Sequence, residues 1–305
     1  MQRLTSPQLA LIGTTASGKS SLALELAEKY AGIILSLDSL SIYRHIDIAS
    51  AKPTAEERNR VPHLGIDILN PDGIFDVTRY QVLYREALQR AREKNVPLFI
   101  VGGSSFYLKI LLEGISPLPS IDPEVSQKVN ELLKDLDKAY RLLRKRAPRY
   151  AESISSGDRY RIEKGLLILL QSGQDPRDYF ATHSPQPIIE APLPLLEIVH
   201  DREVLRQRIS LRTDTMLHSG LVDEVAWLES VYGRAPNAMK AIGIKEVLDY
   251  LDGRYGYDQM REKIIINTAR LAKRQSTFNR SQFSEVFRGD IPSVRSKIED
   301  LLTQT

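Results

Sequence analysis

The residues of this chain that most directly predict chemistry form an eight-residue stretch near the N-terminus, GTTASGKS. It fits the phosphate-loop pattern G-x-x-x-x-G-K-[ST] at every position. Such a loop presents backbone N–H groups and a helix N-terminus to a phosphate group, and its lysine reaches the outer phosphates. We therefore expect Lys19 to supply positive charge and the Ser20 hydroxyl to coordinate Mg²⁺. The residues predicted to contact phosphate groups are Gly13, Thr14, Thr15, Ala16, Ser17, Gly18, Lys19 and Ser20.

A phosphate loop does not by itself specify the reaction. The sequence contains no N-K-x-D motif for reading a guanine base, and no apolar run that ends in a separate Walker-B aspartate. The lack of both motifs argues against a GTPase or a nucleotide hydrolase. Small-molecule kinases lack them too, so a nucleoside or metabolite kinase remains possible.

Two further polar motifs follow short apolar runs. Asp38 opens the motif DSLSIYR, and its carboxylate could act as a general base, orient a substrate hydroxyl or amine, or join a Mg²⁺ shell. Gly102-Gly103-Ser104 follows the next run. Its glycines allow a ligand to approach the backbone closely, and Ser104 offers a hydroxyl. Both motifs are therefore candidates for the site that the phosphate loop begins.

Alternating strands and helices are expected to position these motifs. Short apolar runs at residues 9–12, 32–37 and 96–101 alternate with helical spacing at residues 20–30 and 75–94. This alternation predicts a parallel sheet with helices on both faces. Ligands of such sheets bind beyond the carboxyl ends of the strands. Because all three motifs follow strand ends, we expect them to converge on one site.

The pattern changes at the proline-rich stretch SPLPSIDPE, which predicts a boundary. Helical spacing continues beyond it, with a further helix at about residues 158–171, and another buried strand follows at residues 193–199. From residue 201 onward only helices are expected. We therefore predict an α/β fold with a P-loop parallel sheet flanked by helices, an all-α insertion and a helical C-terminal part. The predicted segments are 1–119 and 193–305 for the core and 120–192 for the insertion.

The composition limits the class of protein. Hydrophobic residues make up 42% and charged residues 27% of the 305-residue chain, and no apolar run approaches the roughly 20 residues that span a bilayer. The sequence has no cysteine, which excludes disulfides, zinc thiolates and thiol catalysis. Its five histidines show no metal-ligand spacing. We expect a cytoplasmic protein that does not bind membranes, and nothing calls for more than a monomer.

Positive charge is concentrated in two tracts, although the net charge is only +3. Residues 134–164 contain ten Lys or Arg and five acids, and residues 261–280 contain six Lys or Arg and one acid. Two such tracts could bind a polyanion. They could equally be two solvated helix faces, and charge alone does not decide between these readings.

Taken together, six ordered blocks resemble the tRNA dimethylallyltransferases, also called tRNA isopentenyltransferases, over nearly the whole chain. Besides the phosphate loop they are DSLSIYR with the AKP that follows it, VGGSSFY, LLEGISPLPSIDPE, AIGIKEVLDYLDG and ARLAKRQSTFNR. They occupy residues 38–44, 51–53, 101–107, 111–124, 241–253 and 269–280. A phosphate loop alone would not justify the resemblance, but the ordered set does.

The resemblance implies that the loop holds the diphosphate of dimethylallyl diphosphate, and that the acceptor is N6 of adenosine 37 beside the anticodon. Lys19, the Mg²⁺ bound by Ser20 and, by family analogy, Arg212 would stabilise the charge of the departing pyrophosphate. Read alone, Arg212 is an ordinary helix-surface arginine. Asp38 would be the general base that takes the proton of the attacking amine, and Ser104 would help position the reacting groups.

The resemblance also gives the basic tracts a function. The insertion would clasp the tRNA anticodon stem-loop, while basic residues of the core contact its backbone. Several positions depart from the family pattern: Leu40 replaces methionine, Ser41 and Tyr160 replace glutamines, Lys164 replaces arginine and Phe278 replaces tryptophan. The predicted tRNA-binding residues are Asp38, Ser39, Leu40, Ser41, Ser104, Tyr160, Arg161, Lys164, Lys240, Lys245, Lys273, Arg274, Gln275 and Arg280.

Other functions compete with this reading. A nucleoside or metabolite kinase shares the phosphate loop and the strand-end aspartate, but it would not need the basic insertion or the AKRQSTFNR block. A non-catalytic RNA-binding relative would not need Lys19, Ser20 and Asp38. A related enzyme that prenylates free adenine nucleotides would not need an anticodon clasp.

Overall fold

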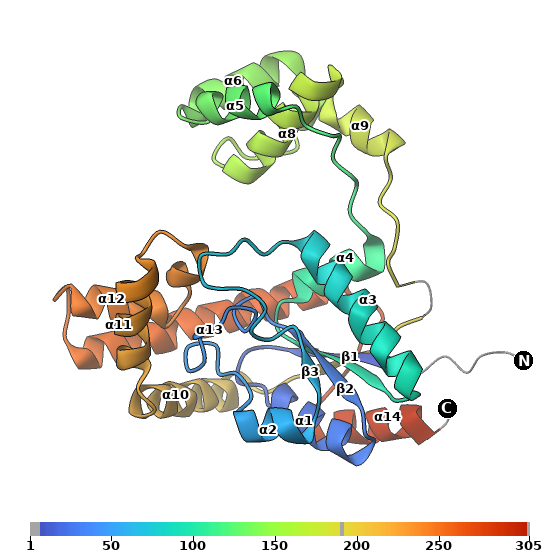
Figure 1. The fold of residues 1–305 in the computed structure, drawn as a ribbon, viewed down its shortest axis with the longest axis vertical. Helices are drawn as coiled ribbons and strands as arrows, with labels where there is room; N and C mark the ends of the chain where they lie inside the picture. Colours follow the sequence, from blue (N-terminus) through green and yellow to red (C-terminus); the bar gives the residue numbers. More distant parts are fainter. Residues whose placement is uncertain (1–6, 190–191, 304–305) are drawn as a thin grey trace, which may run out of the picture. The chain divides into compact units, whose positions relative to one another are not determined.

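The computed structural model describes residues 7–189 and 192–303. Their contacts divide the chain into two compact units (Figure 1). One unit is built from the chain up to Leu111 and from Ile189 onward, and the other spans Leu112–Ile188. The predicted insertion of 120–192 shares residues 120–188 with the second unit.

The first unit contains a parallel sheet with the strand order β3-β2-β4-β1-β5-β6 in the described part of the chain. The strands at residues 9–12, 32–37, 96–101 and 193–199 are confirmed as β1, β2, β4 and β5. The strand bounds are β1 Gln8–Gly13, β2 Ile33–Leu37, β3 His63–Leu64, β4 Leu98–Gly102, β5 Leu195–Ile198 and β6 Phe287–Gly289.

Two short edge strands were not predicted. β3 has two residues and β6 has three, so neither is long enough to show the alternation that marks a strand in sequence. The expectation of helices alone after residue 201 is therefore wrong at β6. This strand forms because Leu196, Glu197 and Ile198 of β5 offer it a parallel partner.

Helices cover the sheet on both faces, as predicted for this fold class (Figure 1). Because side chains alternate along a strand, Leu9 and Leu11 of β1 point to one face, where they pack with Leu22 and Leu26 of helix α1 and Ile298 of helix α14. Helix α3 contacts β2 and β4, and helix α13 contacts β1. These helices are α1 Lys19–Lys29, α3 Val77–Lys94, α13 Tyr257–Gln282 and α14 Ile291–Thr303.

Apart from β6, the predicted helical C-terminal part is confirmed. Helix α10 packs against α13, and α11 packs against α12. In the part of the chain that the structure describes, no helix is both long and apolar enough to cross a membrane. The remaining elements of this part and of the loops are α2 Ala55–Arg60, α4 Ser105–Glu113, α10 Arg202–His218, α11 Leu221–Tyr232, a 3-10 turn at Asn237–Lys240, and α12 Ile244–Leu251.

The second unit is helical and has its own core, which includes Val129, Leu143, Ile162 and Leu166. The helical spacing beyond the proline-rich boundary is interrupted, because Asp135 accepts a hydrogen bond from the Lys138 N–H and so begins a new helix. The helix predicted at residues 158–171 is confirmed. The helices are α5 Pro123–Leu132, α6 Leu136–Arg146, α7 Pro148–Ala151, α8 Arg159–Ser172 and α9 Pro176–Thr182.

Candidate active site

The phosphate loop connects β1 directly to α1 and has the backbone that its glycines permit. Gly13 has a φ of 155°, and a Cβ there would lie 2.9 Å from Ser17 Oγ and 3.1 Å from the Ile198 carbonyl oxygen. Gly18 has a φ of 92° and immediately precedes α1. Glycine is therefore required at both ends of the loop.

Three side chains hold the carbonyl groups of this loop. Lys19 Nζ donates to the Thr14 carbonyl at 3.1 Å. Arg208 Nε of α10 donates to the Ala16 carbonyl at 2.7 Å. The third side chain is that of His200, which donates to the Ser17 carbonyl at 2.7 Å. Neither Arg208 nor His200 was among the predicted site residues. The position of His200 directly after the strand predicted at residues 193–199 is the signal that could have identified this residue.

The charges of Arg212 and Asp38 lie close enough to Lys19 to change its pKa. Burial and then the Arg212 guanidinium lower the pKa of Lys19 from its ordinary 10.5 to about 8, while the Asp38 carboxylate opposes this shift. Burial also lowers the pKa of Arg212, again opposed by Asp38. The reading of Arg212 as an ordinary surface arginine is therefore wrong, because Arg212, on helix α10, lines the same pocket as Lys19.

The loop after β2 presents the Asp38 carboxylate in a fixed orientation. Its Oδ1 atom accepts hydrogen bonds from the backbone N–H groups of Leu40 at 2.7 Å and Ser41 at 3.2 Å. Ser41 is buried, and its hydroxyl pairs with that of Ser36 at 2.9 Å. Within the described residues, both hydrogen bonds of the Asp38 carboxylate go to Oδ1, and Oδ2 has no protein partner.

The loop after β4 packs against the Asp38 loop. A Cβ at Gly102 would lie 2.1 Å from the Leu37 carbonyl oxygen, so the two loops meet closely only because this residue is glycine. Ser104 donates its N–H to the same carbonyl at 3.0 Å. Ser104 Oγ accepts a hydrogen bond from the Ser39 N–H at 3.1 Å. The serine predicted to help position the groups thus holds the residue next to Asp38.

The three loops line one pocket of about 880 Å³, together with residues of α10 and α13. The expected convergence is confirmed. Lys19, Ser20, Asp38, Ser104 and Arg212 all line this pocket. Part of its wall is apolar and can receive a hydrocarbon chain; the apolar residues include Leu24, Ile209, Met216, Ile242, Ile264, Leu271 and Phe278.

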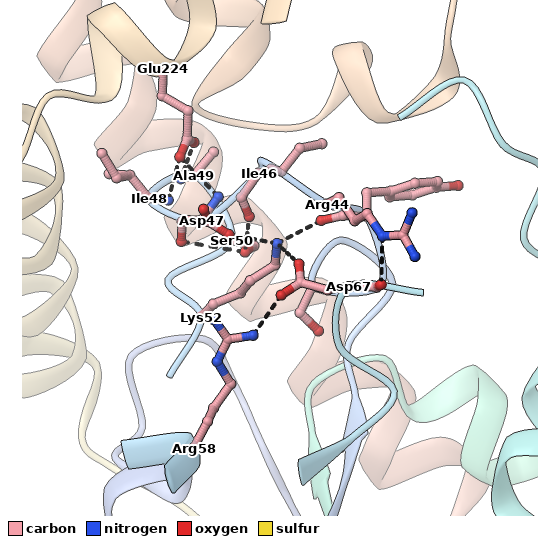
Figure 2. A network of polar contacts seen from close by, with 12 residues as sticks. Arg44, Ile46, Asp47, Ile48, Ala49, Ser50, Lys52, Arg58, Asp67 and Glu224 are labelled. Atoms are coloured by element: carbon pink, nitrogen blue, oxygen red, sulfur yellow. Dashed lines mark hydrogen bonds and ion pairs between the residues drawn. The ribbon is translucent and has the colours of Figure 1, made fainter. Parts of the chain in front are cut away.

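A buried lysine organises the segment that follows the Asp38 loop. Lys52, the lysine of the AKP motif, donates hydrogen bonds to the Tyr43 carbonyl at 2.6 Å, Asp47 at 2.8 Å and Asp67 at 2.7 Å. Figure 2 shows its contacts with the two carboxylates. These three acceptors use all three N–H donors of its ammonium group. Hydrogen bonds from Lys52 and Arg58 lower the pKa of Asp67, although burial alone would raise it.

The same segment is attached to α11 by one carboxylate. Glu224 accepts hydrogen bonds from three consecutive backbone N–H groups, those of Asp47 at 2.8 Å, Ile48 at 2.7 Å and Ala49 at 2.9 Å (Figure 2). Residues 49–53 line the pocket. Lys52 and Glu224 therefore fix one wall of the pocket, and neither role was predicted from sequence.

Replacing Lys52 with methionine is expected to lower the free energy of unfolding by about 2 kcal/mol, because charged hydrogen bonds at a buried site are lost. Only 2% of the Lys52 side chain is exposed. Urea unfolding followed by circular dichroism measures the change. Lys29→Met is the matched control, since the Lys29–Glu299 ion pair is exposed and should contribute little. Equal stability of the two variants would contradict a structural role for Lys52.

The predicted tRNA-binding residues fall into both units. In the first unit Lys240, Lys245, Lys273, Arg274 and Arg280 are exposed. In the second unit Tyr160, Arg161 and Lys164 line a separate pocket of about 440 Å³, and Lys164 Nζ lies 5.5 Å from the centre of the Tyr160 ring.

Gln275 has a different environment from its neighbours on α13. Its Oε1 accepts a hydrogen bond from the Thr15 N–H at 2.9 Å, and its Nε2 donates to the Gly103 carbonyl at 3.1 Å. Both ends of its side-chain amide are therefore used inside the pocket. Its predicted contact with tRNA is not supported by this geometry.

A metal ion could be held here with the help of a ligand. In the described ranges, no group of three or more His, Asp or Glu side chains could hold an ion alone. Ser20 is exposed, lines the pocket and offers a hydroxyl oxygen. Mg²⁺ is commonly held by one or two protein oxygens together with substrate phosphates, so the donor set fits this ion once a diphosphate is bound.

Comparisons with known proteins agree with the geometry of the site. A tRNA dimethylallyltransferase of Sulfurovum sp. (strain NBC37-1) is 52% identical over 297 residues, which are 97% of each chain. That of Sulfurimonas denitrificans is 46% identical over 298 residues, covering 98% of this chain and 99% of the relative.

Solved structures show the same fold. The crystal structure of the full-length tRNA isopentenylpyrophosphate transferase from Bacillus halodurans has a TM-score of 0.71 and 28% identity, covering 98% of this chain and 97% of that one. The family model described as IPP transferase matches residues 41–282. This chain belongs to the IPP transferase family.

Proposed function

We propose that this chain transfers a dimethylallyl group from dimethylallyl diphosphate to N6 of adenosine 37 in tRNA, forming N6-isopentenyladenosine and pyrophosphate. The observation that carries the proposal is the convergence of two cations, Lys19 and Arg212, with the carboxylate of Asp38 in a partly apolar pocket. A diphosphate suits the cations, a five-carbon chain suits the apolar wall, and an amine donor suits the carboxylate. The relatives named as tRNA dimethylallyltransferases support the same reaction.

The residues of the pocket divide the chemistry between them. Loop N–H groups, Lys19 and Arg212 bind the diphosphate and stabilise its charge as the allylic C–O bond breaks. N6 of the adenosine forms the new C–N bond and releases a proton. Oδ2 of Asp38 accepts that proton, while Oδ1 remains bonded to the loop N–H groups that orient the carboxylate. Mg²⁺, held by Ser20 and the diphosphate oxygens, would neutralise further negative charge on the leaving group.

The acceptor base must leave its stack to reach the pocket. An adenosine in a single-stranded anticodon loop is unstacked at lower cost than a paired base. The exposed cations of the first unit are proposed to contact the backbone of the tRNA anticodon stem-loop, and Tyr160, Arg161 and Lys164 of the second unit are proposed to contact it as well. We propose that the chain acts as a monomer in the cytoplasm.

The test of this function offers the purified chain Mg²⁺, labelled dimethylallyl diphosphate and one of two acceptors, unmodified tRNA or AMP. Transfer of phosphate from ATP to small metabolites is assayed in parallel. Label that enters tRNA at the adenosine next to the anticodon supports the proposal. Label in AMP alone would indicate a nucleotide prenyltransferase, and phosphate transfer alone would indicate a kinase.

Reversing two exposed charges should weaken tRNA binding in a way that depends on the salt concentration. The double variant Lys273→Glu and Arg274→Glu removes two proposed contacts with tRNA phosphates. Its loss of tRNA affinity relative to the wild type should be larger at low salt than at high salt. Filter binding of tRNA across a salt series measures the effect, with dimethylallyl diphosphate binding measured separately. Lys297→Glu on α14 is the matched control for a general change in charge. Unchanged tRNA affinity would place the contact surface elsewhere.

A further inference from the structure

The side chain of Gln275 connects the phosphate loop with the loop after β4. The amide of Gln275 accepts from the Thr15 N–H of the phosphate loop and donates to the Gly103 carbonyl of the loop after β4. These partners lie 260 and 172 positions away in the sequence. Because one contact needs the amide oxygen and the other needs the amide nitrogen, the pair of bonds fixes which way the side chain is turned.

The loop after β4 is in turn hydrogen-bonded to the loop that carries Asp38. Gly103 is joined covalently to Ser104, and Ser104 Oγ accepts from the Ser39 N–H, next to Asp38. A short path of bonds therefore runs from the diphosphate loop, through Gln275, to the proposed general base. Every step on this path is a hydrogen bond of 2.9–3.1 Å or a peptide linkage.

The fit around the amide is tight. A Cβ added at Gly103 would lie 2.5 Å from Gln275 Nε2, closer than side chains tolerate. Any residue other than glycine at position 103 must therefore displace the Gln275 amide or move the loop itself. Glycine at 103 and glutamine at 275 are thus a matched pair, although they lie in separate sequence blocks.

We propose that Gln275 is a positioning residue that sets the separation and alignment of the phosphate loop and the loop after β4, rather than a ligand of tRNA. The inference rests on the proposed transfer reaction. In that reaction the attacking nitrogen, the allylic carbon and the leaving oxygen must be held in line, and small misplacements of such groups can cost about 10²-fold in rate. Gln275 contacts the phosphate loop and the loop after β4, and the latter holds Ser39 beside Asp38.

The first test is Gln275→Met, which keeps the length of the side chain but removes the amide. We expect the single-turnover rate of prenyl transfer at saturating tRNA and dimethylallyl diphosphate to fall roughly 10- to 100-fold, with the Kd for tRNA and its salt dependence unchanged. Gln275→Glu retains the acceptor for Thr15 but loses the donor to Gly103, so it should be impaired as well. Gln282→Met, on the same helix and bonded to Lys109, is the control and should keep the wild-type rate.

The second test uses the steric match. Gly103→Ala should slow transfer because its methyl group meets the Gln275 amide, and adding Gln275→Ala should remove that collision. We expect the double variant to be no slower than Gly103→Ala alone, whereas independent effects would multiply and make it slower. This comparison remains decisive even where Gln275→Met lowers the Tm.

The outcomes separate the two proposals. If the wild-type chain transfers no prenyl group to tRNA, the proposed function fails and the positioning role fails with it. If the wild type is active and Gln275→Met matches its single-turnover rate, only the positioning role is overturned. A loss of tRNA affinity with an unchanged rate at saturation would instead make Gln275 an RNA ligand.

Discussion

Replacing Asp38 with asparagine is expected to slow prenyl transfer to tRNA by at least ~10²-fold, the usual contribution of a general base. The substitution is conservative in structure, because the asparagine Oδ1 can still accept the Leu40 and Ser41 N–H groups that shape the loop. It removes the negative charge of the carboxylate, and with it the ability of the side chain to take up the proton that N6 releases. Binding of tRNA should therefore be retained while the chemical step is lost.

Single-turnover kinetics at saturating substrates measure this effect without interference from product release. Asp76→Asn is a matched control, since the Asp76 carboxylate also accepts a backbone N–H, that of Arg79, but lies outside the pocket lining. The control should transfer the prenyl group at the wild-type rate. Near-normal turnover in Asp38→Asn would remove Asp38 as the base.

Much of the site could be predicted because its chemistry follows strand ends. Each of the three motifs comes after an apolar run that forms a strand of the parallel sheet, and the carboxyl ends of parallel strands meet at one edge. Local sequence therefore placed Lys19, Asp38 and Ser104 in a common pocket before any contact was known. The loop glycines were equally readable, since Gly13 and Gly18 have backbone angles that other residues rarely adopt.

The rest depends on pairings that no local pattern records. Glu224 binds N–H groups 175 to 177 positions earlier, and Gln275 binds an N–H 260 positions earlier. In the sequence Gln275 is predicted only as a tRNA contact, and Glu224 looks like an ordinary helix-surface side chain. Read alone, Arg212 looked the same, and only the packing of α10 against α13 brings it to the pocket. The family resemblance, not its own surroundings, singled it out.

The Kd for dimethylallyl diphosphate is expected to rise about tenfold between pH 7 and pH 9, because Lys19 has a pKa of about 8 in the free protein. The charged ammonium binds the anionic diphosphate, so binding favours the protonated form. Below pH 8 the lysine is already protonated, and above pH 8 binding must be accompanied by uptake of a proton. Affinity is therefore lost as the pH rises through 8.

Titration calorimetry in buffers of different ionisation enthalpy measures both the affinity and the proton uptake. Lys19→Met should bind the diphosphate more weakly, without this loss of affinity between pH 7 and pH 9. It should also reduce transfer about 10²- to 10³-fold, as expected when a donor to a developing anion is removed. Lys29→Met, on the same helix, should behave as the wild type. A wild-type affinity that does not change with pH would contradict a lowered pKa at Lys19.

The neighbouring charges should shift this pH dependence in opposite directions. The Arg212 guanidinium lowers the pKa of Lys19, so Arg212→Met should move the loss of affinity to higher pH while weakening binding overall. The Asp38 carboxylate raises the pKa of Lys19, so Asp38→Asn should move the loss to lower pH. A pair of shifts of opposite sign would show that the three groups act on one another. Shifts in the same direction would mean that the diphosphate is bound by charges other than these.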